Sequence, residues 1–411
     1  MVDIPVRDSR IAAPAVPRTE GRFPISGKPE YAYIDSLRGY AVLMVIICHT
    51  TYAVPELPWR VHQLGAFGWH GVQLFFLASC ITLLMSSNYE RTRMGRVSFS
   101  DFFVRRFLRI APMYYLAALL YWIMFPSAQA NLTQLLTSLA FVNAWHPVTT
   151  TTTGDWQVVP GGWSVGVEFT FYFLFPLFLY VITSFRRAAL AFVLALALGG
   201  IADSLAMPAL TARYGTVAAD NFLYFWFFNQ APVFAMGAMA YFTIRGIEAN
   251  PDWKLTQLLR RRSGTVLAGS LLLLAVIAFE PVRFAHQLLL KPELPQFLAA
   301  SAAFVIFILA MSQARRTVFV NRFSSALGKV SFSAYLLHFA VIDLVLDRHQ
   351  ALFHLHETGW KAVAAFVFAI IVVTVVTFLA SAATYTVIEK PMMDWAKRLT
   401  RGPNRAARAV S

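Results

Sequence analysis

Residues 39–55 read GYAVLMVIICHTTYAVP, a mostly apolar run without Asp, Glu, Lys or Arg. A helix of about 17–25 such residues is long enough to cross the roughly 30 Å hydrocarbon core of a bilayer. Nine more apolar stretches follow along the chain, at residues 68–86, 107–125, 164–184, 187–205, 221–244, 264–280, 297–313, 328–346 and 361–386. The sequence therefore predicts an all-α fold, a polytopic membrane bundle of about ten transmembrane helices.

The composition excludes a soluble globular protein. Of the 411 residues, 58% are hydrophobic and 14% are charged. Soluble domains carry about 25% charged residues, because they present a wetted surface on every side. The two cysteines, Cys48 and Cys80, fall inside apolar stretches. They therefore predict apolar packing and not a disulfide framework.

The basic residues are distributed asymmetrically between the loops. If ten helices alternate across the membrane, 29 of the 35 Lys and Arg residues fall on one side, in 1–38, 87–109, 185–187, 245–262, 313–329 and 387–411. Cytosolic loops are rich in Lys and Arg, so both termini are predicted to be cytosolic, in a multi-pass protein of the cell's inner (plasma) membrane. The net charge of +14 then reflects topology, and no nucleic-acid partner is predicted.

The chain divides into three predicted parts. Residues 1–30 are polar and lack an apolar signal region, which predicts a disordered cytosolic tail. Residues 31–392 hold the apolar stretches and form the membrane domain. Residues 393–411 predict a basic cytosolic tail that lies on anionic lipid. The shorter apolar piece 132–145 predicts a re-entrant or interfacial segment, because turn-forming residues follow it.

The first apolar stretch carries two ionisable residues, Arg38 just before it and His49 within it. They are eleven residues apart, which is three helical turns plus about 20°, so both side chains lie on one face about 16 Å apart. This predicts Arg38 at the cytosolic lip and His49 near the middle of the bilayer. The alternative is an interfacial arginine and a histidine that bonds a neighbouring helix.

Glu168 begins the fourth stretch, after Trp163 and Ser164. An acid in the first turn of a helix is stabilised by the helix dipole, which is one explanation. The aromatic residues that follow Glu168 favour a second explanation, in which the carboxylate lies inside the protein close to His49. A carboxylate that bonds one imidazole nitrogen fixes the tautomer and leaves the other nitrogen to act as a base.

Arg105, Arg106 and Arg109 form a basic cluster at the start of the third stretch. Ordinary anchoring on the cytosolic side explains any one of them. Together with Arg38 they predict a site for phosphate groups, which guanidinium binds in a bidentate manner.

His338 lies inside the ninth stretch and predicts either a helix–helix hydrogen bond or a direct role in chemistry. The pair His354 and His356 lacks an evident third ligand, so no metal site is predicted.

Six short motifs, in order along residues 31–392, resemble the membrane-bound acyltransferase family 3. They are Tyr33 to Gly39 with His49, Gly71 to Phe76, Arg105 to Pro112, Trp163 to Tyr172, Gly328 to His338, and Glu389 to Pro391. The resemblance implies O-acyl transfer, usually of acetyl from acetyl-CoA, to a hydroxyl of a glycan, glycolipid or glycosylated metabolite such as lipopolysaccharide or another polysaccharide. Acetyl-CoA is then a co-substrate, and no permanently bound cofactor is expected.

The family's motifs map onto named residues of this chain. They imply that His49 and Glu168 are catalytic and that Arg38, Arg105, Arg106 and Arg109 bind acyl-CoA. Ser164, His338 and Trp163 are candidates for supporting the oxyanion. The chain departs from the pattern in two places. Cys80 stands where members commonly have glycine, and Phe169 and Thr170 stand where many have a second acid and Gln.

Two functions of other classes remain open from the sequence. A secondary transporter or proton-coupled permease uses intramembrane His and Glu residues as a relay, although no inverted repeat is evident in this chain. A structural or sensory membrane protein does not require His49 and Glu168 inside the bundle. The expected partners of an acyltransferase are the lipid bilayer, acyl-CoA and a glycan or glycolipid acceptor.

Overall fold

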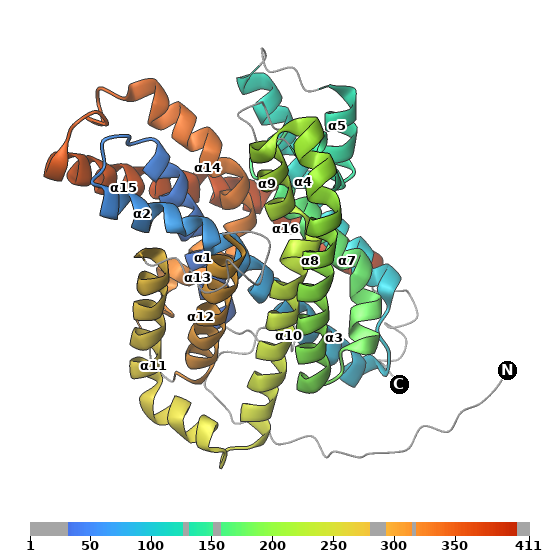
Figure 1. Ribbon diagram of the computed structural model, residues 1–411. Helices are drawn as coiled ribbons and strands as arrows, with labels where there is room; N and C mark the ends of the chain where they lie inside the picture. The colour runs from blue at the N-terminus through green and yellow to red at the C-terminus, as the bar shows by residue number, and fades with distance from the viewer. Residues whose placement is uncertain (1–31, 126–130, 151–157, 280–292, 315–317, 401–411) are drawn as a thin grey trace.

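The computed structural model describes residues 32–125, 131–150, 158–279, 293–314 and 318–400, and the elements in these ranges are helices (Figure 1). The predicted tail 1–30 lies outside the described residues, as do residues 401–411 of the predicted basic tail. The first half of the chain forms α1 (Ala32–Tyr52), α2 (Trp59–Ala66), η1 (Phe67–His70), α3 (Gly71–Met94), α4 (Phe99–Met124), α5 (Leu132–Leu139), η2 (Asn143–Trp145), α6 (Pro147–Thr150), α7 (Gly162–Val181) and α8 (Phe185–Tyr214).

The second half continues the helical bundle. It forms α9 (Thr216–Phe225), α10 (Phe227–Ala249), α11 (Lys254–Phe279), α12 (Glu293–Gln313), α13 (Arg322–Lys329), α14 (Ser331–Val345), η4 (Asp347–His349), α15 (Gly359–Thr384), the π-helical turn η5 (Tyr385–Glu389) and α16 (Lys390–Thr400). The pairs α8 with α10 and α11 with α12 stand side by side on two flanks of the bundle (Figure 1).

The predicted polytopic bundle is confirmed. In the described part of the chain, eight helices are long and apolar enough to cross a membrane, or nine if the bent pair α13 and α14 forms one span. The predicted number of about ten transmembrane helices includes residues 221–244 as one of them. There the chain breaks at Trp226 between α9 and α10, and this segment is not among the candidate spans.

Side chains replace the backbone hydrogen bonds that are lost at this break. Asn229 donates to the carbonyl of Leu223 at 2.5 Å, and Gln230 donates to that of Tyr224 at 2.7 Å. Asn229 also donates to the buried carboxylate of Asp203 on α8, at 2.8 Å. The break is therefore held by buried polar contacts, as a break among apolar helices requires.

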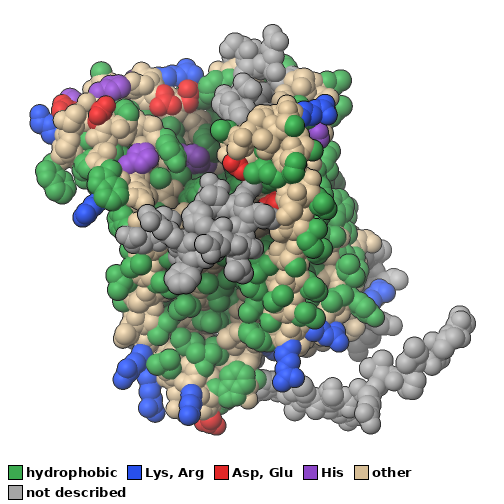
Figure 2. Space-filling model, in the orientation of Figure 1, with side chains coloured by type: hydrophobic (Ala, Val, Ile, Leu, Met, Phe, Trp, Pro, Cys, Tyr) green, Lys and Arg blue, Asp and Glu red, His purple; other side chains and the backbone are tan. Residues whose placement is uncertain are grey.

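Figure 2 shows a largely hydrophobic middle band and many Lys and Arg side chains along the lower edge of the face in view. The turn between α10 and α11 lies at this edge in Figure 1, and the helix ends that it joins carry exposed Arg245, Lys254 and Arg260. This is the side that the sequence predicts to be cytosolic, and the cytosolic location of the termini stays a prediction.

Helix α1 lies at the centre of the bundle and contacts α3, α13, α14 and α15. The backbone of α1 packs directly against the backbone of α13, with no side chain between them at Gly39 and Gly328. A Cβ atom on Gly39 would collide with the carbonyl of Ser324, and one on Gly328 would collide with that of Asp35. The hydroxyls of Ser36 and Ser324 bond across the same contact at 3.0 Å. Small residues therefore fix the position of α1 against α13.

The chain bends by 84° between α13 and α14. Val330 stands at the bend, and no side chain from α13 caps the first turn of α14. Ser333 in this first turn instead donates its hydroxyl to the carboxylate of Glu389, which the π-helical turn η5 brings inward. The bend and this contact together set the direction of α14, which carries Tyr335 and His338.

The predicted re-entrant or interfacial segment 132–145 forms two short pieces, α5 and η2. The eight residues of α5 rise only about 12 Å and cannot cross a bilayer as one helix. Phe141 between them stacks on Phe169 of α7 with ring centroids 3.9 Å apart. The segment is therefore fastened to α7.

Substitution of Gly328 by valine should destabilise the protein strongly, because the new side chain meets the backbone of Asp35 and forces α13 away from α1. Overpacking of this kind typically costs about 1–3 kcal/mol or more. Gly264→Ala is the matched control, since nothing lies within 4 Å of a Cβ atom there. The measurement is the melting temperature of detergent-purified protein, and an equal melting temperature for both variants would contradict the close contact.

Candidate donor cavity and histidine pair

A cavity of about 660 Å³, including its open mouth, lies between five helices. Side chains from α1, α3, α4, α7 and α14 line it, namely Arg38, Val72, Phe75, Phe76, Ser79, Arg106, Arg109, Ile110, Ser164, Val165, Glu168, Tyr172, Ser331, Phe332 and Tyr335. The depth of the cavity can be estimated along α7, because Ser164, Glu168 and Tyr172 line it at successive turns of this helix. The eight residues from Ser164 to Tyr172 correspond to about 12 Å.

The inner end of the cavity, toward the predicted cytosolic side, is cationic. Arg38 enters from α1, and Arg106 and Arg109 enter from α4. Arg38 donates to the hydroxyl of Thr82 at 3.2 Å. The guanidinium of Arg106 lies 5.7 Å from the ring centroids of both Phe102 and Tyr172. Aromatic faces thus hold this cation in an interior with little water.

Glu168 lines the same cavity and is held by two hydroxyl groups. Ser79 of α3 and Tyr172 of α7 each donate to its carboxylate oxygen Oε1 at 2.5 Å. Three guanidinium groups therefore face one carboxylate among the lining residues, which leaves the cavity positively charged. Such a site favours an anionic ligand, and guanidinium binds phosphate in a bidentate manner.

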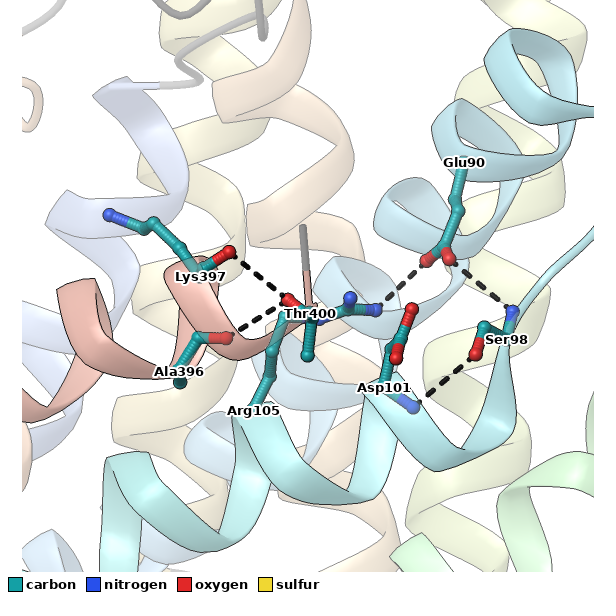
Figure 3. Close-up of polar contacts among 7 residues, drawn as sticks. All are labelled: Glu90, Ser98, Asp101, Arg105, Ala396, Lys397 and Thr400. Carbon is teal, nitrogen blue, oxygen red and sulfur yellow. Dashed lines mark hydrogen bonds and ion pairs between the residues drawn. The ribbon is translucent and has the colours of Figure 1, made fainter. Parts of the chain in front are cut away.

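Arg105 does not line this cavity. Its guanidinium forms an ion pair with Glu90 at 2.9 Å, and Glu90 also accepts a hydrogen bond from the backbone of Ser98 (Figure 3). Ser98 caps α4, because its hydroxyl accepts a hydrogen bond from the backbone N–H of Asp101 in the first turn. These contacts turn Arg105 toward the connection between α3 and α4, so three of the four predicted arginines converge.

The outer end of the cavity is closed by a polar triangle. The hydroxyl of Tyr335 donates to the carbonyl of Gly161 at 2.9 Å and accepts a hydrogen bond from Ser164 at 2.9 Å. Ser164 also reaches the Gly161 carbonyl at 3.0 Å. The ring of Tyr335 meets that of Phe75 edge-on with centroids 6.0 Å apart. The outer end thus combines this triangle with the two aromatic rings of Tyr335 and Phe75.

His49 lies behind this aromatic end, in the last turn of α1. The helix begins at Ala32, seven residues before the predicted apolar stretch, so His49 is nearer the outer end of α1 than its centre. The half-buried ring lies 5.2 Å from the ring of His338 and 4.2 Å from that of Phe339. A chain of ring contacts thus leads from Tyr335 through His338 to His49.

His338 is completely buried, and its two nitrogens differ. Nδ1 donates to the backbone carbonyl of Tyr335 at 2.7 Å, which fixes the tautomer and leaves Nε2 as an acceptor. Nε2 has no hydrogen-bond partner among the described residues. The expected pairing of His49 with Glu168 is not formed in the part of the chain that the structure describes, where Ser79 and Tyr172 donate to the carboxylate instead. The nearest imidazole to His49 in this arrangement is that of His338.

Trp163 is buried, and its ring packs against Phe225 with centroids 4.3 Å apart and against Phe76 at 6.3 Å. It is absent from the cavity lining, whereas its neighbour Ser164 belongs to it. Ser79, Tyr172 and Tyr335 are not among the site residues predicted from the sequence. Tyr172 carries a usable signal, since it lies four residues after Glu168 and therefore on the same helix face.

Comparison with known proteins identifies the family of this chain. The sequence model of a family described as an acyltransferase domain matches residues 31–382, which is most of the chain. The chain belongs to this family. It is also similar to acyltransferase MdmB of Streptomyces mycarofaciens, with 26% identity over 392 residues that cover 88% of this chain and 91% of the relative. No solved structure matches. The protein is therefore a multi-pass membrane acyltransferase.

The two departures from the acyltransferase pattern have structural counterparts. Cys80 packs against Gly237 of α10, where an added Cβ atom would lie 2.8 Å from that of Cys80. The opposite helix thus supplies a glycine at this contact. Phe169 stacks on Phe141, and Thr170 accepts a hydrogen bond from Trp145 at 2.9 Å. These two residues anchor the segment between α5 and α6 and do not line the cavity.

Proposed function

We propose that this protein is an O-acyltransferase of the inner membrane that moves an acyl group, acetyl in the simplest case, from acyl-CoA to a hydroxyl group. The acceptor is a glycan, a glycolipid or a glycosylated metabolite. The observation that carries the proposal is the cavity, whose cationic inner end is joined by its aromatic outer end to the pair His49 and His338.

The inner end supports the binding of the donor's phosphate groups. Arg38, Arg106 and Arg109 come from two helices and face one carboxylate. Guanidinium groups in an environment of low dielectric constant attract phosphate more strongly than in water. Acyl-CoA enters from the cytosol, where it is made, and its phosphates displace water at this end. The pantetheine arm then follows the cavity outward.

The length of the cavity supports a thioester at the aromatic end. The arm of CoA extends about half the thickness of the hydrocarbon core, roughly 15 Å. The wall from Tyr172 to Ser164 spans about 12 Å. A donor held by its phosphates at the arginines therefore carries its thioester to Tyr335 and Ser164, next to His338.

His49 then acts as the general base. It takes the proton of the acceptor hydroxyl, and the oxygen forms a bond to the thioester carbonyl carbon. The carbon–sulfur bond breaks, and the leaving thiolate takes the proton from His49. His338 orients His49 by accepting a hydrogen bond from it at Nε2, which has no partner among the described residues, and so takes the role that the sequence predicts for Glu168. Ser164 supplies a donor for the oxyanion.

The acceptor approaches from the outer side of the membrane. His49 lies in the last turn of α1 and is half-buried, so an alcohol can reach it without passing the arginines. The outer segment 126–163 contains no Lys or Arg and is rich in Thr, Trp and Asn, a composition suited to contact with sugars. Donor and acceptor thus arrive from opposite sides.

Replacement of His49 by alanine should lower acyl transfer by about 10²–10⁴-fold, the usual contribution of a general base. His62→Ala is the control, because His62 contacts Tyr52 outside the cavity. The measurement is thiol release from acetyl-CoA by purified protein with a panel of methyl glycosides. Near-normal release by the His49 variant would contradict the assignment, and solute uptake without thiol release would instead indicate a transporter.

Replacement of Arg106 or Arg109 by alanine should raise the KM for acyl-CoA by about tenfold or more, since a hydrogen bond to a charged group is worth about 1.5–3 kcal/mol. Arg105→Ala should leave this KM close to that of the wild type, because Arg105 does not line the cavity and its guanidinium is paired with Glu90. An equal rise in KM for Arg105 and Arg106 variants would contradict the placement of the donor.

A further inference from the structure

The cavity stops one aromatic ring short of the histidines. Tyr335 lines it, whereas His338 and His49 do not. The ring of Tyr335 lies 5.9 Å from that of His338, which lies 5.2 Å from that of His49. The ring of Tyr335, in edge contact with Phe75, therefore forms a partition at the outer end of the cavity, with His338 between it and His49.

The partition is held by the hydroxyl of Tyr335. This hydroxyl donates to the Gly161 carbonyl and accepts from Ser164, both at 2.9 Å. The first turn of α7 is shaped around it. Gly161 has a φ of +75°, and a Cβ atom there would lie 2.9 Å from the Tyr335 hydroxyl oxygen. A residue other than glycine would therefore displace the hydroxyl as well as strain the backbone.

We propose that Tyr335 is a gate between the donor cavity and His49, and that its hydrogen bonds to Ser164 and Gly161 keep the gate closed until the acceptor is bound. The inference rests on the proposed function. Tyr335 acts here as a positioning residue: it decides which nucleophile, acceptor or water, meets the thioester.

The need for such a gate follows from the exposure of His49. His49 is only partly buried, and water is the competing nucleophile there when no acceptor is bound. A thioester beside this base would then be hydrolysed. The water oxygen would bond to the carbonyl carbon, the carbon–sulfur bond would break, one water proton would pass to the thiolate through His49, and a carboxylic acid would be released. A closed Tyr335 holds the thioester away from this reaction.

The variant Tyr335→Phe opens the gate without leaving a buried polar group that lacks a hydrogen-bond partner. The hydroxyl of Ser164 already reaches the Gly161 carbonyl at 3.0 Å, so these two groups still satisfy each other once the phenol oxygen is gone. The ring and its contact with Phe75 remain. The loss is confined to the two hydrogen bonds that hold Tyr335 closed.

The test measures acyl-CoA hydrolysis without an acceptor, as thiol released from acetyl-CoA by the full-length protein in detergent. Tyr335→Phe should release thiol about fivefold faster than the wild type or more, the effect of losing hydrogen bonds of ordinary strength. Adding His49→Ala to Tyr335→Phe should return hydrolysis to the wild-type rate or below, because the base is then missing.

Tyr121→Phe is the matched control. The hydroxyl of Tyr121 also ties α14 in place, since it donates to the Leu336 carbonyl at 2.7 Å and accepts from the Ala340 backbone at 3.1 Å. Tyr121 is buried and does not line the cavity. Its variant should hydrolyse acetyl-CoA at the wild-type rate. If Tyr335→Phe does not fold, Phe75→Leu thins the same partition and should raise hydrolysis likewise.

Three results overturn the gate. They are unchanged hydrolysis by Tyr335→Phe in an enzyme that still transfers acetyl to a methyl glycoside, an equal rise in Tyr121→Phe, and a rise that His49→Ala does not suppress. A wild-type protein that releases no thiol with or without glycosides contradicts the proposed function itself, and the gate with it.

Discussion

Three guanidinium groups inside a helical bundle are the constraint on which the rest of this structure depends. Charges in an apolar interior persist only where other groups stabilise them. Arg38 has the hydroxyl of Thr82, Arg106 has two aromatic faces, and Glu168 supplies the negative charge. Glu168 in turn is fixed by Ser79 and Tyr172. The helices that meet at the cavity are therefore those that supply these groups.

The second requirement is the direction of α14. This helix carries Tyr335 at the end of the cavity and His338 beside His49. Its course is set by the 84° bend after α13 and by the carboxylate of Glu389, which receives Ser333. The π-helical turn places Glu389 there, and such turns often occur at functional sites. The donor cavity and the histidine pair thus depend on one short segment.

Much of the arrangement could be predicted from the sequence. Hydropathy and the asymmetry of Lys and Arg predict the bundle, and topology predicts that Arg38 lies near the cluster Arg105, Arg106 and Arg109. Glu168 is expected beside His49 instead, whereas the structure places it in the lining of the same cavity as Arg38, Arg106 and Arg109. The choice of Arg106 over Arg105 could not be predicted, because it depends on where the turn after α3 places Glu90.

The partner of His49 could not be predicted for a similar reason. Residues 328–346 form one apolar run in the sequence, and nothing in that run signals the bend at Val330. Only the bend brings His338 to α1. Long-range placements of this kind depend on tertiary packing and have no local pattern.

The central claim is that the cavity holds the acyl donor with its phosphates on the arginines. The most direct measurement is an electron cryomicroscopy structure of the protein with CoA bound. The account predicts phosphate density within hydrogen-bonding distance of Arg38, Arg106 or Arg109 and a pantetheine arm that ends near Tyr335. Density for CoA elsewhere on the protein, with the cavity unchanged, would contradict it.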